Sequence, residues 1–399
     1  MPTQLPLIPG ILEKNDENIA MRHHLHAHPE LAFQEHDTSV WVAEKLRSYG
    51  YDVHCGLGGT GVVAQLKRGD SPRRLGLRAD MDALPILEET GLPYASTHTG
   101  KMHACGHDGH TASLLSAARY LADQGRFDGT LNLIFQPAEE GLGGARKMIE
   151  DGLFERFPCD GVFAFHNWPG LPVGKFGVLP GIFMSSSDTV FITVNGRGGH
   201  GAMPHDCVDA AVVAAHIVVA LQTIVARNID PREMAVITVG NLKAGSISNV
   251  IAETAQLDLS VRAYAPEVRA LLRDRIITLA EQQAGALGAT VDIDYRWRYP
   301  ALKNDPGMTQ FAVDTIREAF GEEALNPEQR TLTGSEDFSF MLEACPGCYV
   351  IIGNGETTDH GGSCLHNSRY DFNDQLLPVA ASYWVYLTEK FLNPAVSQC

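Results

Sequence analysis

The densest group of potential metal ligands in this chain is the segment HACGHDGH at residues 103–110. A cysteine thiolate, histidine nitrogens and carboxylates suit a divalent transition metal such as zinc, and manganese becomes more favourable as oxygen ligands are added. Glycines at 106 and 109 permit sharp backbone turns before a helix expected from Thr111. A single histidine would indicate only a polar loop, but this density favours a metal site in a strand-to-helix loop.

Two adjacent carboxylates, Glu139 and Glu140, follow an apolar segment that predicts a buried strand. Neighbouring side chains point in different directions, so one carboxylate could bind a metal ion while the other acts as general base. An isolated Glu-Glu pair is more often a solvated acidic pair. The buried strand before it strengthens the functional hypothesis, because polar groups at strand ends of α/β sheets commonly form sites.

Asp80 and Asp82 follow another predicted strand and lie on one side of an extended segment. Carboxylates beside a metal-binding histidine commonly hold its ring through a hydrogen bond, although a simple turn explains this pair equally well. His166 ends a further apolar run, and His366 lies near the C-terminus. Each of these two histidines, taken alone, would more often be structural.

The elements that must position these residues fall into two patterns. The first pattern alternates strands with helices, which predicts a parallel or mixed sheet covered on both faces. Its strands are expected at 62–67, 74–78, 130–135, 161–166 and 348–352. One or two helices are expected within 11–50, and further helices at 111–121, 143–151 and 308–320.

The second pattern has the order β-α-β-β-α-β, which predicts a ferredoxin-like unit. Its strands are expected at 188–194, 234–239, 254–263 and 291–297, and its helices at 209–227 and 266–284. We therefore expect an α/β chain whose first domain is discontinuous, at 1–183 and 301–399. An inserted α+β domain is expected at 184–300.

Length and charge restrict the class of protein. A chain of 399 residues predicts about two or three domains, with ample length for a large core. The formal net charge of −17 disfavours nucleic-acid binding, which needs a basic surface. The longest apolar run, 210–226, is interrupted by His216 and Gln222, so we expect no membrane span. The N-terminal segment lacks a signal-peptide pattern and the eight cysteines fit free thiols, which predicts a cytoplasmic protein.

Taken together, these motifs carry a resemblance that covers nearly the whole chain. The sequence resembles the M20 metallopeptidase family and, within it, subfamily D, the amidohydrolases, which include hippurate, N-acyl-amino-acid and auxin-conjugate hydrolases. The matching motifs are RADMDALP (78–85), HACGHDGH (103–110), QPAEEG (136–141), FHNWPG (165–170), GRGGHGAMPH (196–205), SNVIAETAQLDLSVR (248–262), GSEDFSF (334–340) and LHNSRYDFND (365–374).

The resemblance implies a catalytic domain of the zinc-peptidase type that binds two divalent metal ions, Mn²⁺ or Zn²⁺, with Co²⁺ or Ni²⁺ as further options. Cys105 matches a bridging position between the two ions, and Asp82 matches a residue that orients a ligand. Asp80 occupies a position where other branches have a ligating histidine, so it is either a weak ligand or a supporting residue. His103 and His110 match positions that do not ligate. The implied ligands are Cys105, His107, Glu140, His166 and His366.

The resemblance also implies the reaction. Glu139 matches the general base that takes a proton from a metal-activated water, which then attacks an amide carbonyl. Glu139 finally gives the proton to the leaving amine, and no acyl-enzyme forms. The sequence agrees in one respect, because it contains no G-x-S-x-G motif for a serine nucleophile.

The inserted domain resembles the lid and dimerisation domain of the family. His200 matches a residue that reaches the partner subunit's site and supports the oxyanion, so we expect a homodimer or a higher homo-oligomer. Asn249 and Arg262 match residues associated with the substrate carboxylate, and arginine suits bidentate carboxylate binding. From the residues alone, Asn249 would be a turn cap and Arg262 a surface charge.

The main hypothesis is a dinuclear metal-dependent amidohydrolase that cleaves N-acyl amino acids, such as hippurate, to a carboxylic acid and a free amino acid. The alternatives within the family are a dipeptidase or carboxypeptidase and an N-acetyl-diaminopimelate deacetylase. A metal-binding protein without catalysis is a third class. The presence of Glu139 and of every implied ligand argues against it.

Overall fold

The computed structural model describes residues 6–357 and 361–393, which form two compact units. The first unit comprises the chain up to Phe183, Lys303–Arg330 and the chain from Asp337 onward; the second comprises Met184–Leu302 and Thr331–Glu336. The short segment 331–336 lies within the range that the sequence places in the first domain. It groups with the second unit because Met184 forms a β-bridge with Leu332 and Ser185 hydrogen-bonds to the carbonyl oxygen of Gly334.

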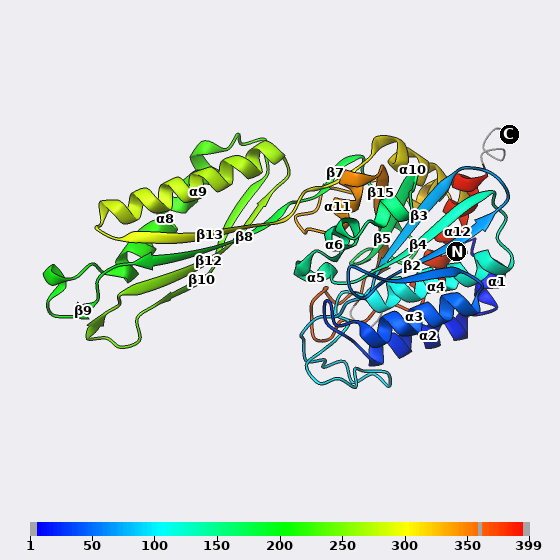
Figure 1. Ribbon diagram of the computed structural model, residues 1–399, viewed down its shortest axis with the longest axis horizontal. Coiled ribbons are helices and arrows are strands. Elements are labelled where there is room, and N and C mark those ends of the chain that lie inside the picture. Colours follow the sequence, from blue (N-terminus) through cyan, green and yellow to red (C-terminus); the bar gives the residue numbers. More distant parts are fainter. Residues whose placement is uncertain (1–5, 358–360, 394–399) are drawn as a thin grey trace. The chain divides into compact units, whose positions relative to one another are not determined.

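A seven-stranded mixed sheet forms the centre of the first unit (Figure 1). Its four central strands are parallel to one another and buried, whereas the strands at both edges are antiparallel to their neighbours. The predicted mixed sheet is confirmed. Across the sheet the strands are β1 (Asp52–Leu57), β2 (Gly61–Arg68), β4 (Gly129–Gln136), β3 (Arg74–Asp80), β5 (Gly161–Pro169), β15 (Gly347–Gly355) and β6 (Phe176–Gly177).

Helices pack around this sheet. Helix α4 contacts α2, α3 and α12, and α4 and α12 are buried along most of their length. Helix α4 begins at His107, one turn before the expected start at Thr111, because Gly106 adopts a left-handed φ of 97° and allows the turn into the helix there. The helices are α1 (Pro9–Leu12), α2 (Asn15–Ala27), α3 (His36–Ser48), α4 (His107–Asp123), α5 (Glu139–Leu142), α6 (Gly144–Glu150), α7 (Leu153–Arg156), α10 (Pro306–Phe320), α11 (Phe338–Ala344) and α12 (Leu376–Leu392).

The parallel order β4-β3-β5 brings the sequence motifs to one edge of the sheet. Asp80, the last residue of β3, pairs with Gln136, the last residue of β4. His166 lies towards the end of β5, on the other side of β3. Since the carboxyl ends of parallel strands meet at the same edge, the loops that follow them are neighbours.

The second unit contains an antiparallel four-stranded sheet with its own core. Two helices pack against each other and against the sheet, and the strand order is that of the predicted ferredoxin-like unit. Two additional two-stranded pairs were not expected from the sequence, because their strands are only two to four residues long. The elements are β8 (Ser187–Asn195), α8 (Ala210–Asn228), β10 (Ala235–Ala244), β12 (Thr254–Ala263), α9 (Pro266–Ala286) and β13 (Thr290–Tyr299), with the short pair β9 (Gly199–His200) and β11 (Val250–Ile251). The other short pair, β7 (Gly181–Met184) and β14 (Leu302–Asn304), lies where the chain passes between the units, and most of its residues belong to the first unit.

Helix α8 is, among the described residues, the one helix that is long and apolar enough to cross a membrane by length and composition. Its side chains at Val213, Ile217, Leu221 and Ile224 are buried in the core of the second unit. Packing against the sheet of that unit therefore explains the apolar side chains on one face of the helix.

A buried ionic network joins α2 to α4 in the first unit. Arg22 donates a hydrogen bond from Nε to Asp108 Oδ2 at 2.9 Å, and both side chains are fully buried. Its other nitrogens contact Asp371 and Asp374, in the loop that follows the His366 segment. Arg22 therefore connects α2 with two segments that carry predicted metal ligands.

We expect Arg22→Met to lower the free energy of unfolding by about 3–5 kcal/mol, because it leaves Asp108 charged, buried and without its main cation. Urea unfolding followed by tryptophan fluorescence measures this change. Arg119→Met is the matched control, since Arg119 also joins α4 to α2 but pairs with an exposed Glu17; its expected loss is about 1 kcal/mol or less. Equal losses for the two variants would contradict this account of the network.

Candidate active site

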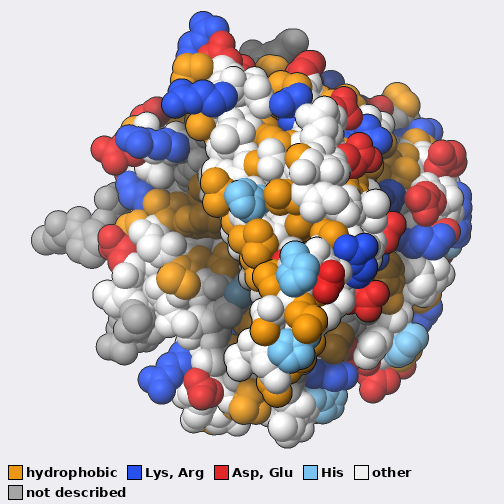
Figure 2. Space-filling view, turned by 90° about the vertical axis from the view of Figure 1, so that its left-hand side faces the viewer, with side chains coloured by type: hydrophobic (Ala, Val, Ile, Leu, Met, Phe, Trp, Pro, Cys, Tyr) orange, Lys and Arg blue, Asp and Glu red, His pale blue; other side chains and the backbone are white. Residues whose placement is uncertain are grey.

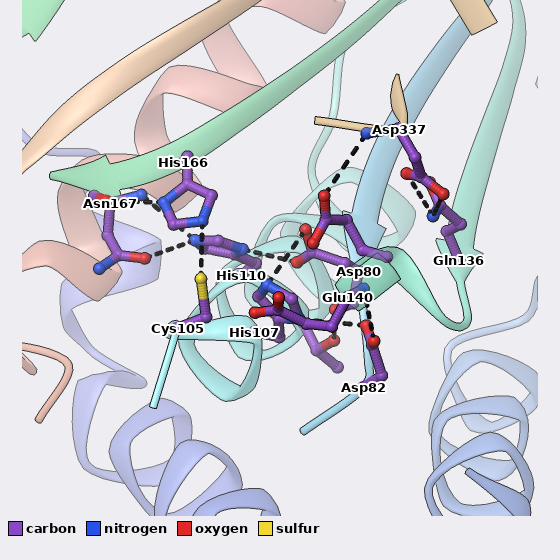
Figure 3. A network of polar contacts seen from close by, with 12 residues as sticks. Asp80, Asp82, Cys105, His107, His110, Gln136, Glu140, His166, Asn167 and Asp337 are labelled. Carbon is purple, nitrogen blue, oxygen red and sulfur yellow. Dashed lines mark hydrogen bonds and ion pairs between the residues drawn. The ribbon is translucent and has the colours of Figure 1, made fainter. Parts of the chain in front are cut away.

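Five side chains that the resemblance implies as metal ligands come together in the first unit. Figure 3 shows four of them, Cys105, His107, Glu140 and His166. One potential ligand atom from each of Cys105, His107 and His166 lies within 4.8 Å of the other two. The same holds for Cys105, Glu140 and His366. Cys105 is common to both groups, which is the arrangement expected of a ligand that bridges two cations.

The loop before α4 positions the first group. Gly106 is required at its place, because a Cβ atom there would lie 2.3 Å from Asn167 Oδ1 and 2.5 Å from Tyr370 Oη. Cys105 Sγ lies 3.3 Å from His166 Nε2. The other ring nitrogen of His166, Nδ1, lies 2.7 Å from the carbonyl oxygen of Asn167 and donates to it. That hydrogen bond leaves the Nε2 lone pair of His166 directed towards Cys105, as metal-binding histidines require.

Asp82 links His107 to Glu140. Its Oδ1 lies 3.2 Å from His107 Nδ1, and its Oδ2 accepts a hydrogen bond from the Glu140 backbone N–H at 2.9 Å. The opposite nitrogen, His107 Nε2, is buried and has no hydrogen-bond partner among the described residues. A carboxylate on one nitrogen and a buried second nitrogen that makes no hydrogen bond are features of a histidine prepared to bind a metal ion.

The adjacent carboxylates Glu139 and Glu140 point in different directions, as the sequence predicts. Ala138 before them has a left-handed φ of 53°, and the backbone at Glu140 departs from helical geometry. Glu139 is buried, and its Oε1 lies 3.4 Å from the backbone N–H of Asp337. Glu140 Oε1 lies instead 3.1 Å from His366 Nε2. His366 itself has a positive φ of 63°, and its N–H donates to Ala104 next to Cys105.

Asp80 is fully engaged with neighbouring side chains. Its Oδ2 accepts from Arg78 at 2.8 Å, its Oδ1 lies 2.6 Å from His110 Nδ1, and the closest approach to His107 Nε2 is 3.6 Å. The other ring nitrogen of His110, Nε2, lies 2.7 Å from Asn167 Oδ1. The sequence leaves two roles open for Asp80, a weak metal ligand or a supporting residue. These contacts favour the supporting role.

His103 lies apart from these groups. It is buried, and neither of its ring nitrogens has a hydrogen-bond partner among the described residues. Burial lowers the pKa of His103 to about 4, so the ring is neutral. This environment fits the non-ligating position that the resemblance implies for His103.

Sequence reasoning missed a buried network behind Glu139. Asp337 accepts hydrogen bonds from Gln136 Nε2 at 2.8 Å, from Arg78 Nη2 at 3.2 Å and from the backbone N–H of Ala145 at 2.9 Å. Arg78, Gln136 and Asp337 lie inside the recognised motifs, but no local spacing indicates that they meet. Glu35, another buried carboxylate near this loop, was also missed because it lies in no metal-binding pattern.

The electrostatics of this site favour a cation. Burial raises the pKa of the Cys105 thiol, and the charges of Glu140 and Glu139 raise it further. Burial lowers the pKa of His107, but the carboxylates of Asp80 and Asp82 outweigh it and raise this pKa to about 10. The buried acidic groups therefore stabilise positive charge at this place, and the donor set of thiol, imidazole and carboxylate fits divalent transition metals.

The three predicted substrate-binding residues lie in the second unit. His200 is exposed, and its Nδ1 accepts a hydrogen bond from the Ala202 N–H at 3.0 Å, which puts the ring proton on Nε2. Asn249 is exposed next to it in the β9–β11 segment. Arg262 Nη1 donates to Ser335 Oγ at 2.8 Å and, among the described residues, has no carboxylate within ion-pair distance.

Comparison with known proteins defines the class. The model of peptidase family M20/M25/M40 matches residues 76–390. A hippurate hydrolase from Campylobacter jejuni is 46% identical over 386 residues, covering 97% of this chain and 99% of the relative. An N-acetyldiaminopimelate deacetylase from Listeria monocytogenes is 36% identical, covering 94% and 99%.

A solved structure gives the same result. The Bacillus subtilis YxeP protein, described as a dinuclear metal-binding peptidase of the M20 family, has a TM-score of 0.80 at 32% identity, covering 96% of this chain and 99% of that one. The chain belongs to the peptidase family M20/M25/M40. The resemblance drawn from the motifs is confirmed.

We expect Asp82→Asn to weaken divalent metal binding by about 10- to 100-fold, because the variant loses the charge that orients His107. Calorimetric titration of the metal-free protein with Mn²⁺ or Zn²⁺ measures the change. Asp128→Asn is the control, since Asp128 also accepts a backbone hydrogen bond but precedes the start of β4, at the other end of that strand from the site. Unchanged affinity in Asp82→Asn would refute the role assigned to this carboxylate.

Proposed function

We propose that this protein is a dinuclear metal-dependent amidohydrolase that cleaves N-acyl amino acids, such as hippurate, to a carboxylic acid and a free amino acid. The observation that carries the proposal is the position of Glu139. One of its carboxylate oxygens lies within 4.8 Å of potential ligand atoms of His107 and Glu140. Sequence identity of 46% to a hippurate hydrolase supports the choice of substrate class.

Two divalent cations would be held by the two ligand groups that share Cys105. When bound, they lower the pKa of water and polarise an amide carbonyl. Imidazole and thiolate ligands favour Zn²⁺, and the carboxylate of Glu140 also allows Mn²⁺, with Co²⁺ or Ni²⁺ as further candidates. The proposed ligands are Cys105, His107, Glu140, His166 and His366.

Glu139 would transfer the proton. Its carboxylate takes a proton from the attacking water as the new C–O bond forms at the amide carbon. It then gives this proton to the amide nitrogen as the C–N bond breaks, so that an acid and a free amine leave. Burial of Glu139 keeps bulk water from competing for the proton. Asp82 accepts a hydrogen bond from the Glu140 backbone N–H and is proposed to hold the neighbouring base, Glu139, in position.

The second unit would recognise the substrate. His200 presents an Nε2–H donor, which suits the oxygen that becomes negative during attack. The Arg262 guanidinium suits the substrate carboxylate, and Asn249 is proposed to bind the same group. An N-acetyl-diaminopimelate deacetylase and a dipeptidase or carboxypeptidase are the alternatives, the first supported by the relative at 36% identity.

The direct test is glycine release from hippurate by the metal-stripped protein, with and without added Mn²⁺. We expect release only with metal. Glu139→Gln should retain the bound metals and lower kcat by about 10²- to 10⁴-fold, because the amide cannot accept the proton. Exposed Glu150→Gln is the control.

Full activity of Glu139→Gln at normal metal content would exclude Glu139 as the base. Metal-dependent hydrolysis of N-acetyl-diaminopimelate or of dipeptides, without hydrolysis of hippurate, would favour the corresponding alternative.

We also propose that the protein is a cytoplasmic homodimer formed through the second unit. Helix α8 leaves an apolar stripe exposed beside the edge strand β10, with Val219 at 70% and Val212 at 49% exposure. Figure 2 views the second unit from one side. Hydrophobic side chains, with histidines among them, gather on the face turned towards the viewer. An apolar helix face beside an unpaired strand edge is a surface that a second copy could cover. The described cysteines are free thiols, which supports a reducing compartment.

We expect Val219→Lys to convert the dimer to a monomer, because two copies would bring lysines together in an apolar contact. Sedimentation velocity measures the mass. Val40→Lys is the matched control, since Val40 is similarly exposed on α3 of the first unit and should leave the dimer intact. A monomeric wild-type protein, or a dimeric Val219→Lys, would refute this interface.

A further inference from the structure

Glu35 is a fully buried carboxylate that belongs to none of the ligand groups. It lies in the loop before α3, and each of its oxygens accepts one hydrogen bond. Oε2 accepts from the Thr60 hydroxyl at 2.6 Å, and Oε1 accepts from the backbone N–H of Ala138 at 2.8 Å. Among the described residues, no lysine, arginine or histidine lies within ion-pair distance of it. Burial therefore raises the pKa of Glu35, and a buried acid of this kind destabilises the fold unless its hydrogen bonds compensate.

The hydrogen bond from Ala138 fixes an unfavourable backbone conformation. Ala138 has a φ of 53° and a ψ of 45°, a region in which a Cβ atom is crowded. It stands between Gln136, which ends β4, and the pair Glu139–Glu140. The direction in which that pair leaves the sheet therefore depends on keeping Ala138 left-handed.

Three carboxylates from three separate segments hold backbone amides between Ala138 and Ala145, which lies in the first turn of α6. Glu35 accepts the N–H of Ala138, Asp82 accepts that of Glu140, and Asp337 accepts that of Ala145. Asp82 and Asp337 also contact other site residues. Glu35 differs from them, because its other hydrogen bond to a separate segment is from Thr60, which belongs to none of the ligand groups.

The loop that carries Glu35 is itself attached to the Asp82 segment. Leu31 forms a β-bridge with Ala83, whose N–H donates to the Glu30 carbonyl oxygen at 2.8 Å. Phe33 in the same loop has a positive φ of 61°. Displacement of this loop would therefore be transmitted to both the Asp82 segment and Ala138.

We infer that Glu35 is a positioning residue for the reaction, whose hydrogen bond to the Ala138 N–H aims Glu139 and Glu140 into the site. This inference rests on the proposed function of Glu139 as the base. It assigns Glu35 no contact with substrate or metal. Misplacement of a catalytic group by about 1 Å lowers rates by about 100-fold, so a backbone anchor one residue from the base affects turnover strongly.

The experiment compares Glu35→Ala with Glu30→Ala in the metal-loaded protein. Glu30 is the matched control, because it lies in the same loop and its carboxylate also accepts backbone hydrogen bonds, from Asp37 and Thr38 at the start of α3. Two readouts are taken: kcat and KM for hippurate, and amide hydrogen exchange of the peptide covering 136–145, followed by mass spectrometry.

We expect Glu35→Ala to lower kcat by about 10- to 100-fold with little change in KM, and to accelerate exchange in peptide 136–145 by about tenfold. Glu30→Ala should leave both quantities near wild-type values, even where it lowers the melting temperature. Glu35→Gln should retain most of kcat, because its carbonyl oxygen still accepts the Ala138 N–H and its NH₂ can donate to Thr60.

Ala138→Gly in the Glu35→Ala background tests the backbone argument. Glycine adopts the left-handed region without a Cβ clash, so the double variant should recover part of the lost kcat. Glu35→Asp, which shortens the reach of the carboxylate, replaces Glu35→Ala should the latter fail to fold, with the same direction expected.

Wild-type exchange in peptide 136–145 of Glu35→Ala would overturn the inference, as would a kcat loss equal to that of Glu30→Ala. Failure of the proposed function is recognised separately. If the wild-type protein hydrolyses no N-acyl amino acid, the exchange comparison between Glu35→Ala and Glu30→Ala still decides whether Glu35 anchors the loop.

Discussion

The carboxylate of Asp82 is the contact on which the geometry of the candidate site depends. One oxygen orients the His107 ring and the other holds the backbone of Glu140. Because Asp82 comes two residues after the end of β3, which lies between β4 and β5, it is placed where the loops of three strands meet. A single side chain at the centre of the sheet edge thus couples the helix that carries His107 to the loop that carries both glutamates.

The surplus of buried acid around this contact explains why the site suits cations. Burial and the neighbouring carboxylates raise the pKa of Cys105, so the thiolate form needs a positive charge beside it. Metal binding, thiol deprotonation and the arrangement of the ligands are therefore linked equilibria. The hydrogen bonds of Asp80, Asp82 and Asp337 hold side chains and backbone around these ligands in position.

The sequence predicted the parts of this structure that depend on local pattern. Apolar strands such as 131–135 and the alternating strand 254–263 were found because burial sets their composition. Strand β1 was missed, since this edge strand is mostly exposed and reads as polar. The ligand set came from resemblance and not from spacing. Glu35 had no signal, because its importance comes from a hydrogen bond to a residue 103 positions later along the chain.

The strained backbone positions lie in segments that form or support the candidate site. Among the described residues, the non-glycine positions with positive φ are Phe33, Ala138 and His366, and each lies in a segment that builds the site or supports it. Such conformations persist only where surrounding contacts fix them. The strands place the motifs at one edge of the sheet. Beyond the strand ends, the direction of the chain is set by carboxylates that accept hydrogen bonds from backbone amides. The segment 138–145, which contains α5 and the start of α6, donates to three such acceptors from distant segments. Its geometry is therefore a property of the assembled first unit and not of its own sequence.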